Sequence, residues 1–417
     1  MSFTRYPDYK DSGVEWLSSI PRLWGFKRIN VIASLNDDVL PETTDGEQEI
    51  TYVDIGSVSL SAGVEKFEVF TFKDAPSRAR RKVKDGDVII STVRTYLKAI
   101  APIVNPPENL VVSTGFAVLR AKSDVKSSFT KYALQSDGFL DEIISRSTGV
   151  SYPAINASEI GFIKIPVPSL PEQTQIANFL DQETTKIDAL VAEQKKIIEL
   201  LKSKLDSLVL ESFDNLDTKL IRIKNAVEVI ERPVIQDDSQ IYEPLGLFNR
   251  GRGLFHKEKR ATADMGDSDF YWIKEGDLIL SGQFAWEGSV ALAYKEEEGC
   301  VVSHRYPVIR GKMNITLTEY LFALLTTDHG NFLLNQSSVG AAGRNRPLNI
   351  NLLLKELIPV PNIKTQEKIA KIVVERRNLL REINEQTKLI NERRSALISA
   401  AVTGQIDIRN YQPKEAV

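Results

Sequence analysis

The chain alternates between two kinds of hydrophobic pattern. The first consists of short runs rich in β-branched and aromatic residues, separated by Asp-Gly, Glu-Gly and Pro-Pro turns. Such runs predict a curled, mixed sheet with a few short helices. They cover residues 50–56, 64–72, 87–93, 110–119, 277–282 and 300–309. Between them, residues 130–147 and 317–338 carry helical apolar spacing, and each segment is expected to form a pair of helices.

The second pattern is a long helical one, from residue 171 to about 213 and again from 365 to about 402. Apolar residues recur there at steps of three and four, the seam of a coiled coil. The first seam comprises Ile176, Leu180, Ile187, Leu190, Ile197, Leu201, Leu205 and Leu208, with polar Gln194 on the same line. The second comprises Ile369, Val373, Leu380, Ile383, Ile390, Leu397 and Ala401. At about 1.5 Å per residue each helix is roughly 60 Å long, so its apolar stripe requires another long helix as partner.

Charge indicates which helix that partner is. Residues 171–216 contain five Lys and nine Asp or Glu, whereas residues 364–403 contain nine Lys or Arg and five Glu. Opposite net charges of −4 and +4 favour pairing of these two helices with each other over self-pairing of either. The alternative is two solvated faces whose totals are accidental. We expect an antiparallel pair within one chain, with two globular heads held apart by a two-helix rod.

Both patterns occur twice because the sequence is duplicated. KDGDVIIS at 84–91 returns as KEGDLILS at 274–281, and VVSTGFAVLR at 111–120 returns as VVSHRYPVIR at 301–310. Both offsets are 190 residues, and ten of these eighteen ungapped positions are identical, which excludes a chance match of common strand and turn strings. A unit of this length is far longer than a solenoid repeat, so each copy is expected to be a domain with an appended helix.

The boundary inside each copy is the string IPVP, at 165–168 and 358–361, after which Gln, Ile and Ala recur at matching positions. The fold class predicted is α+β, with two duplicated α/β domains separated by two long antiparallel coiled-coil helices in a pseudo-twofold arrangement. The predicted segments are domain 1 at 1–169, helix 1 at 170–216, domain 2 at 217–363, and helix 2 with a C-terminal tail at 364–417.

Composition narrows the class of protein further. The chain has 417 residues, 42% hydrophobic, which suits two or three folded domains and excludes wholesale disorder. No stretch reaches the roughly 18 apolar residues of a membrane helix, and the first residues lack a secretory signal. With a single cysteine, Cys300, no internal disulfide can form, so we expect a cytoplasmic protein without a membrane partner.

The motifs of several enzyme classes are missing from the sequence. Residues 105–108, NPPE, resemble a methyltransferase loop that holds a flipped adenine, but Glu replaces the stacking aromatic and no glycine-rich cofactor turn precedes it. There is no phosphate loop and no serine nucleophile elbow. The acidic pairs Asp85/Asp87 and Glu275/Asp277 flank glycines and are interpreted as turn formers. We therefore expect no catalytic site and no bound cofactor.

A metal site is not predicted either. The histidines lie far apart and are not at ligand spacing from cysteine or carboxylates. They are His256, His304 and His329.

Each copy contains one cluster of basic residues, and these clusters are the sequence feature that indicates a binding function. The first consists of Arg78, Arg80, Arg81, Lys82 and Lys84. The second consists of Arg250, Arg252, Lys257, Lys259 and Arg260. Lys and Arg neutralise phosphates, and the glycines at 251 and 253 allow a close approach of the backbone. The alternative for either cluster alone is a solvated charged face.

Base-reading residues are expected where the copies match around a segment but differ inside it. After the paired strands come 92–98 and 282–288, where Arg94 and Gln283 have the fork geometry to bind guanine and adenine edges respectively through two hydrogen bonds. The other candidates there are Tyr96, Lys98 and Trp286. A second pair of segments, 148–156 and 339–351, adds Tyr152, Asn156, Arg344, Asn345 and Arg346. Ordinary surface aromatics are the alternative for Tyr96 and Trp286.

Taken together, these strings resemble the specificity subunit of Type I restriction-modification systems over essentially the whole chain. The resemblance is carried by the two GD-strands, the two IPVP…Q…IA entries into helices, and three longer strings. These are YPDYKDSGVEWLSSIP, ETTKIDALVAEQKKIIELLK and ERRSALISAAVTGQIDIR. The two domains differ strongly between the matched strands, which blocks any transfer of base contacts from relatives.

The resemblance implies two target-recognition domains, each reading half of a split sequence in double-stranded DNA. It implies that the helices space the half-sites and dock two methyltransferase subunits, through which restriction subunits join. S-adenosylmethionine, ATP and Mg²⁺ would then be bound by those partners. Two alternatives stay open at this point: a self-sufficient DNA methyltransferase or nuclease, and a coiled-coil scaffold with no role on DNA.

Overall fold

The computed structural model describes residues 3–411 except 215, 236, 238, 267 and 341–345. They form two compact units, residues 1–192 with 385–417, and residues 193–384. The long helices α5 (Leu170–Glu211) and α10 (Ile363–Val402) each contribute residues to both units. The two long helices expected from the heptad pattern are thus confirmed. Among the described residues, no helix is both long and apolar enough to cross a membrane.

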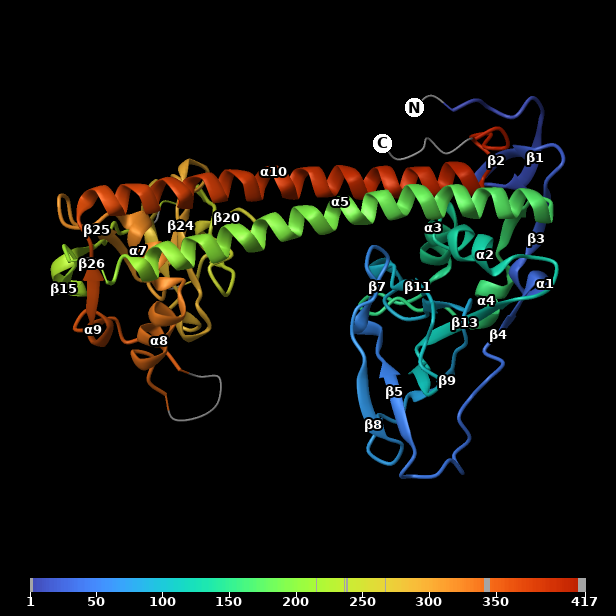
Figure 1. Cartoon of the computed structure of the whole chain (residues 1–417), viewed down its shortest axis with the longest axis horizontal. Coiled ribbons are helices and arrows are strands. Elements are labelled where there is room, and N and C mark those ends of the chain that lie inside the picture. Colours follow the sequence, from blue (N-terminus) through green and yellow to red (C-terminus); the bar gives the residue numbers. More distant parts are fainter. Residues whose placement is uncertain are drawn as a thin grey trace. The chain divides into compact units, whose positions relative to one another are not determined.

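The first unit is built on two four-stranded sheets with short helices packed beside them (Figure 1). One sheet has the order β11-β10-β13-β4 and is antiparallel; the other, β8-β5-β12-β9, contains one parallel pair, β5 with β12. Its strands are β1 (Tyr9–Val14), β2 (Leu17–Pro21), β3 (Gly25–Arg28), β4 (Ala33–Leu35), β5 (Glu49–Val53), β6 (Val58–Ser59), β7 (Gly63–Val64), β8 (Glu68–Thr71), β9 (Ala79–Lys82), β10 (Val88–Ser91), β11 (Ile100–Pro102), β12 (Leu110–Ser113), β13 (Phe116–Ala121) and β14 (Lys164–Val167). Its short helices are α1 (Ile29–Ile32), α2 (Ser127–Ala133), α3 (Asp137–Arg146) and α4 (Ala157–Phe162).

The second unit repeats the central sheet, in the order β16-β25-β22-β23. Ile279 pairs with Ala291 and Val308, as Ile89 pairs with Ala101 and Val118 in the first unit, so the strand register is repeated at the 190-residue offset. Its strands are β15 (Lys219–Arg222), β16 (Val227–Val229), β17 (Ile241–Tyr242), β18 (Leu245–Leu247), β19 (Leu254–His256), β20 (Arg260–Ala261), β21 (Phe270–Trp272), β22 (Leu278–Leu280), β23 (Val290–Leu292), β24 (Val301–Ser303), β25 (Val308–Gly311) and β26 (Leu357–Val360). Its short helices are α6 (Ile223–Ala226), α7 (Thr318–Leu325), α8 (Asp328–Gln336) and α9 (Ile350–Leu353). The mixed α+β class and the two expected helix pairs are confirmed.

The long helices pair with each other, as expected from their charges, and in the antiparallel sense expected of a duplicated chain. In the first unit, Ile176 and Leu180 near the start of α5 share a core with Ile398 and Val402 at the end of α10. In the second unit the ends are exchanged, because Leu205 and Val209 of α5 share a core with Ile369 and Val373 of α10. An ion pair of opposite charges, Arg394 Nε to Asp188 Oδ1 at 3.5 Å, joins the helices in the first unit.

The heptad seam is not buried along its whole length. Leu190 and Ile197, which the spacing places on the seam, are each 45% exposed, so their expected burial was wrong. At Ile176 and Leu205 the strands and loops of a domain core cover the side chain together with the partner helix. A single partner helix covers only one side of an apolar residue, which explains the exposure where no such core adjoins it.

Each copy ties its GD turn to the central sheet through a buried carboxylate. Asp87 accepts the Lys84 N–H at 2.8 Å and binds Arg120 through both oxygens, at 2.8 and 2.7 Å. Asp277 accepts the Lys274 N–H at 2.8 Å and binds two guanidinium groups, those of Arg232 and Arg310. The interpretation of these aspartates as turn formers is thus confirmed, and the ion pairs explain why an arginine recurs at the end of the matched strands.

A buried glutamine anchors each long helix to its own domain. The Gln173 amide donates to Pro168 O at 2.9 Å and its Oε1 accepts the Lys126 N–H at 2.8 Å. The Gln366 amide donates to Pro361 O and Ile315 O, and its Oε1 accepts the Leu317 N–H at 2.8 Å. Both side chains are at most 1% exposed. These bonds join the first turn of each helix to the segment that follows the central sheet.

Candidate nucleic-acid interface

In the first unit two distant loops meet at Arg94 and Tyr152. The Arg94 N–H donates to Pro153 O at 2.7 Å, and Arg94 itself has a left-handed backbone with φ 50°. Its guanidinium lies over the Tyr152 ring at 4.8 Å, and both side chains are exposed. Within the part of the chain that the structure describes, the guanidinium has no hydrogen-bond or ion-pair partner. Stacking orients the planar group while its donor edge stays available to a ligand.

The second unit forms the corresponding arginine–aromatic contact, but there the aromatic residue comes from the earlier loop and the arginine from the later one. The Leu348 N–H donates to Gly282 O at 2.8 Å, the counterpart of the bond from the Ile155 N–H to Thr92 O in the first unit. Here the arginine comes from the later loop, because Arg346 lies 5.8 Å from the ring of Trp286. Arg346 also donates to Asn335 Oδ1 at 2.7 Å. Arg344 and Asn345, the other residues predicted in this loop, lie outside the described residues.

The short turns that carry these residues are equivalent. Each is a 3-10 turn, η2 (Thr95–Leu97) and η4 (Ala285–Glu287), so Tyr96 and Trp286 occupy the same position. Gln283 is exposed and lies one residue before the position equivalent to Arg94, which is occupied by Phe284. The two predicted base readers therefore follow equivalent strands without being structural counterparts.

Three predicted residues of the first unit are not part of the Arg94–Tyr152 contact. Tyr96 and Lys98 line a cavity of about 340 Å³ together with residues of α10, among them Arg394. Lys98 also forms an ion pair with Asp141 at 3.3 Å. Asn156 is exposed directly before α4, and its side chain makes no capping hydrogen bond there. The prediction that these residues contact DNA is untested by the geometry.

The first basic cluster lies on and beside the edge strand β9. Arg80 packs over the Phe72 ring at 4.5 Å, and Arg78 is exposed just before the strand. Burial lowers the pKa of Arg81, whose Nε is enclosed and has no hydrogen-bond partner among the described residues. Lys82 and Lys84 lie 3.7 and 3.6 Å from the same carboxylate, that of Asp38. Arg78 and Arg80 are thus the members best placed to meet an external anion.

The second basic cluster surrounds a hollow next to Gln283. A cavity of about 250 Å³ is lined by Lys257, Arg260 and Gln283, which brings one predicted base reader together with two predicted phosphate ligands. Lys259 instead lies 3.4 Å from Glu243. Arg250, with φ 60°, and Arg252, stacked 5.2 Å from the Phe248 ring, lie outside this lining.

Sequence reasoning missed two residues of this cavity. Arg305 and Tyr306 also line it, and Arg305 is exposed. Burial raises the pKa of the Tyr306 phenol. Both residues fall inside VVSHRYPVIR, at positions where the copies differ between matched residues. The criterion that selected Gln283 would have found them as well.

One group of side chains in the second unit could hold a metal ion. Glu243, His256 and Cys300 place a carboxylate oxygen, a ring nitrogen and a sulfur within 4.8 Å of one another. None of the three lines the cavity beside Gln283, although Pro244 and Lys257, adjacent to two of them, do.

Comparison with known proteins assigns the chain to a family. The family model of the type I restriction modification DNA specificity domain matches the chain twice, over residues 21–202 and 216–392. The chain therefore belongs to this family, that of the DNA specificity subunits of type I restriction-modification systems. The two matches correspond to the two copies found in the sequence.

Individual relatives are distant. The chain is 19% identical over 315 residues to the type I restriction enzyme StySPI specificity subunit of Salmonella potsdam, covering 69% of this chain and 67% of that protein. It is 26% identical over 208 residues to the MjaIX specificity subunit of Methanocaldococcus jannaschii, covering 48% and 45%. A chain from a solved structure on complex assembly and conformational transition of the type I R-M system is 20% identical, with a TM-score of 0.59 over 93% of this chain and 99% of that chain. This last similarity supports the fold.

Proposed function

We propose that the chain is the non-catalytic recognition subunit of its system and reads a bipartite target in double-stranded DNA. Each domain reads one half-site, and the two long helices set the spacing and dock two methyltransferase subunits. Restriction subunits join through that complex in the cytoplasm, and S-adenosylmethionine, ATP and Mg²⁺ are bound by the partners. The observation that carries this proposal is the paired arginine–aromatic contact, present at equivalent loops of both domains but built from different residues.

A protein that recognises two different half-sites requires different residues at equivalent loops of its two domains. A shared scaffold presents the loops in the same way, whereas the groups at their tips determine which base edges they can bind. Arg94, held over Tyr152 with its donor edge free, suits a guanine. Gln283, exposed at the rim of a basic cavity, suits an adenine.

The first prediction separates sequence reading from affinity. Arg94→Ala should relax one position of one half-site by about 1–3 kcal/mol, because it removes a bidentate base contact. Arg94→Lys is the matched control, since it keeps the charge but not the fork; it should relax the same position while retaining most non-specific affinity. Gln283→Ala should act in the same way on the other half-site. Binding to every single-base variant of the selected target is the measurement.

Variants of the first basic cluster provide the comparison, because they should change affinity without changing base preference. Replacing Arg78 and Arg80 by Ala should weaken binding to all sequences alike and flatten the log–log salt dependence by about 0.9 for each phosphate that is no longer neutralised. Arg81 is left intact because it is partly buried. A change of base preference in this variant, with none in Arg94→Ala, would reverse the assigned roles. If none of the variants altered DNA binding, the scaffold alternative would replace the proposal.

The second prediction concerns the long helices as a ruler. Inserting one heptad after Ala192 in α5 and one after Asn384 in α10 should lengthen the pair by about 10 Å. The preferred spacer between half-sites should then grow by about three base pairs, at about 3.4 Å each. Selection from DNA with randomised spacer lengths, using the complex with its methyltransferase subunits, measures this. A heptad inserted into α5 alone is the control and should abolish binding, because it displaces the pairing; an unchanged spacer in the double insertion would refute the ruler.

The absence of a cofactor site is tested on the isolated chain. Equilibrium dialysis with S-adenosylmethionine should give no binding, and binding should appear once methyltransferase subunits are added. Saturable binding to the isolated chain would instead support the alternative of a self-sufficient methyltransferase.

A further inference from the structure

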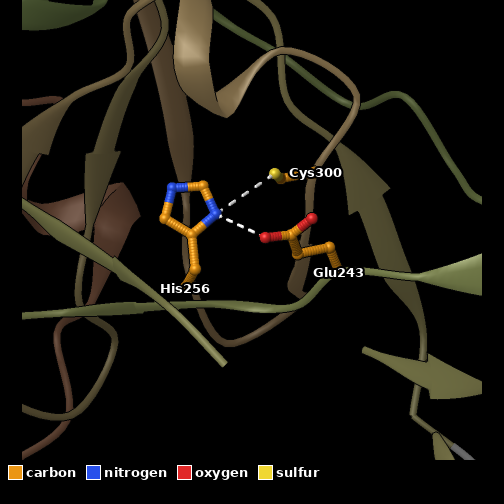
Figure 2. A group of neighbouring side chains, drawn as sticks. All are labelled: Glu243, His256 and Cys300. Carbon is orange, nitrogen blue, oxygen red and sulfur yellow. Dashed lines mark hydrogen bonds and ion pairs between the residues drawn. The ribbon is translucent and has the colours of Figure 1, made fainter. Parts of the chain in front are cut away.

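Three segments of the second unit bring unlike metal-ligand types to one point. Glu243 follows β17, His256 ends β19 and Cys300 directly precedes β24 (Figure 2). His256 Nδ1 lies 2.7 Å from Glu243 Oε1 and 3.9 Å from Cys300 Sγ, so one ring nitrogen faces both other groups. Beyond the ring, Glu297 Oε1 lies 3.8 Å from His256 Nε2. The cluster is therefore centred on Nδ1.

An ion pair between His256 and Glu243 with a core cysteine nearby is the simpler interpretation of the cluster. It explains the short distance from nitrogen to oxygen and the burial of Cys300, which is 4% exposed. It leaves unexplained why the sulfur adjoins the same nitrogen that the carboxylate binds. Cys300 belongs to an apolar cluster with Leu245, Ile273, Val302 and other apolar residues, where an aliphatic side chain would fill its position equally well.

We propose that Glu243, His256 and Cys300 bind one Zn²⁺ ion through Oε1, Nδ1 and Sγ, with water completing a tetrahedral site. Sulfur, imidazole nitrogen and carboxylate oxygen together are typical zinc ligands, whereas Mg²⁺ and Ca²⁺ prefer oxygen alone. In a tetrahedral site with the usual bond lengths, ligand atoms lie about 3.3–3.6 Å apart. The 2.7 and 3.9 Å separations bracket that range, and all three atoms lie within 4.8 Å of one another, so side-chain shifts of about an ångström would form the site.

The ion would hold the segment that carries the second basic cluster. His256 is followed by Lys257, and the same segment continues to Arg260; both basic residues line the cavity beside Gln283. Binding of Glu243 to the ion would also weaken its ion pair with Lys259, at 3.4 Å. In the first copy the positions at the 190-residue offset are Val53, Lys66 and Leu110, which cannot bind zinc. The site is thus specific to the second domain, and its existence does not depend on the proposed function.

The test is metal binding by the full-length chain. After removal of metals with a chelator, titration with Co²⁺ should saturate at one ion per chain and give a thiolate-to-cobalt charge-transfer band, and Zn²⁺ should displace the cobalt. Cys300→Ser should abolish the band, and His256→Ala should weaken binding at least about 100-fold, since even changes to groups behind the ligands cost 10–100-fold. His304→Ala, an exposed histidine of the same domain, is the matched control and should bind like the unmodified chain.

Two results would overturn the proposal. One is the absence of stoichiometric Co²⁺ or Zn²⁺ binding by the unmodified chain. The other is binding that Cys300→Ser and Glu243→Gln leave unchanged, which would mean an ion held elsewhere. Both variants preserve side-chain size, and circular dichroism with the metal absent confirms that they fold, so a loss of binding can be assigned to the ligand.

Discussion

Asp277→Asn should destabilise the second domain by about 3 kcal/mol, the lower end of the cost of removing one partner from a buried ion pair. Asp277 is fully buried and lies between Arg232 and Arg310, whose side chains are 23% and 32% exposed. Asparagine keeps the size and one oxygen that can accept the Lys274 N–H. It lacks the charge that balances two guanidinium groups, and its NH2 group would face the donors of Arg232 and Arg310 that one carboxylate oxygen now accepts. A destabilisation of this size is a large part of the 5–15 kcal/mol that stabilises a typical domain.

Hydrogen exchange followed peptide by peptide in increasing urea measures this effect, because it resolves the two units of one chain. Peptides from 193–384 should open at lower urea and those from the first unit should be unchanged. Asp87→Asn provides an internal comparison and should cost less, since Asp87 pairs with Arg120 alone. Glu275→Gln, on the exposed side of the same turn, is the control and should have little effect. Equal destabilisation by Glu275→Gln and Asp277→Asn would contradict the central role of the buried carboxylate.

Gln366→Leu should cost about 2–4 kcal/mol and release the start of α10 from its domain. Leucine fills a similar volume but leaves the Leu317 N–H and the carbonyls of Ile315 and Pro361 without partners. Each unsatisfied buried group costs about 1–3 kcal/mol, part of which relaxation recovers. The side chain is fully buried, so water does not reach these groups without local opening.

The expected observation is faster amide exchange in the segment 312–317, which precedes α7, under conditions where the rest of the domain stays protected. Glu367→Leu places the same side chain at the exposed neighbouring position and should leave exchange unchanged. Gln173→Leu is the equivalent change in the first unit and should expose the segment around Lys126 instead. Unchanged exchange in both glutamine variants would show that these bonds do not anchor the helices.

Much of the architecture follows from local sequence. The duplication, the strands, the two helix pairs and the long helices could all be predicted because their signals are periodic along the chain. The GD turns were predictable because they are local: Asp87 and Asp277 each close a turn with a backbone N–H three residues earlier. Opposite charge on the two long helices predicted their pairing, because each sum runs over one continuous segment.

Tertiary structure alone decided which side chains meet. The contacts of Arg94 with Tyr152 and of Arg346 with Trp286 join loops far apart in sequence, and nothing in either loop specifies its partner. The exposure of Leu190 depends on how many other side chains cover that position of the seam. The heptad period does not predict this number.

The cluster of Glu243, His256 and Cys300 is the clearest case. Its members are 13 and 44 residues apart and match no ligand spacing, so the sequence alone predicted no metal site. Strand pairing brings them together, because β18 pairs with β19 and Pro244 adjoins Val301 at the start of β24. The spacing of ligand residues in a sequence reveals a metal site only when one local element carries all the ligands. Here three separate segments do so, and their proximity is a property of the folded sheet.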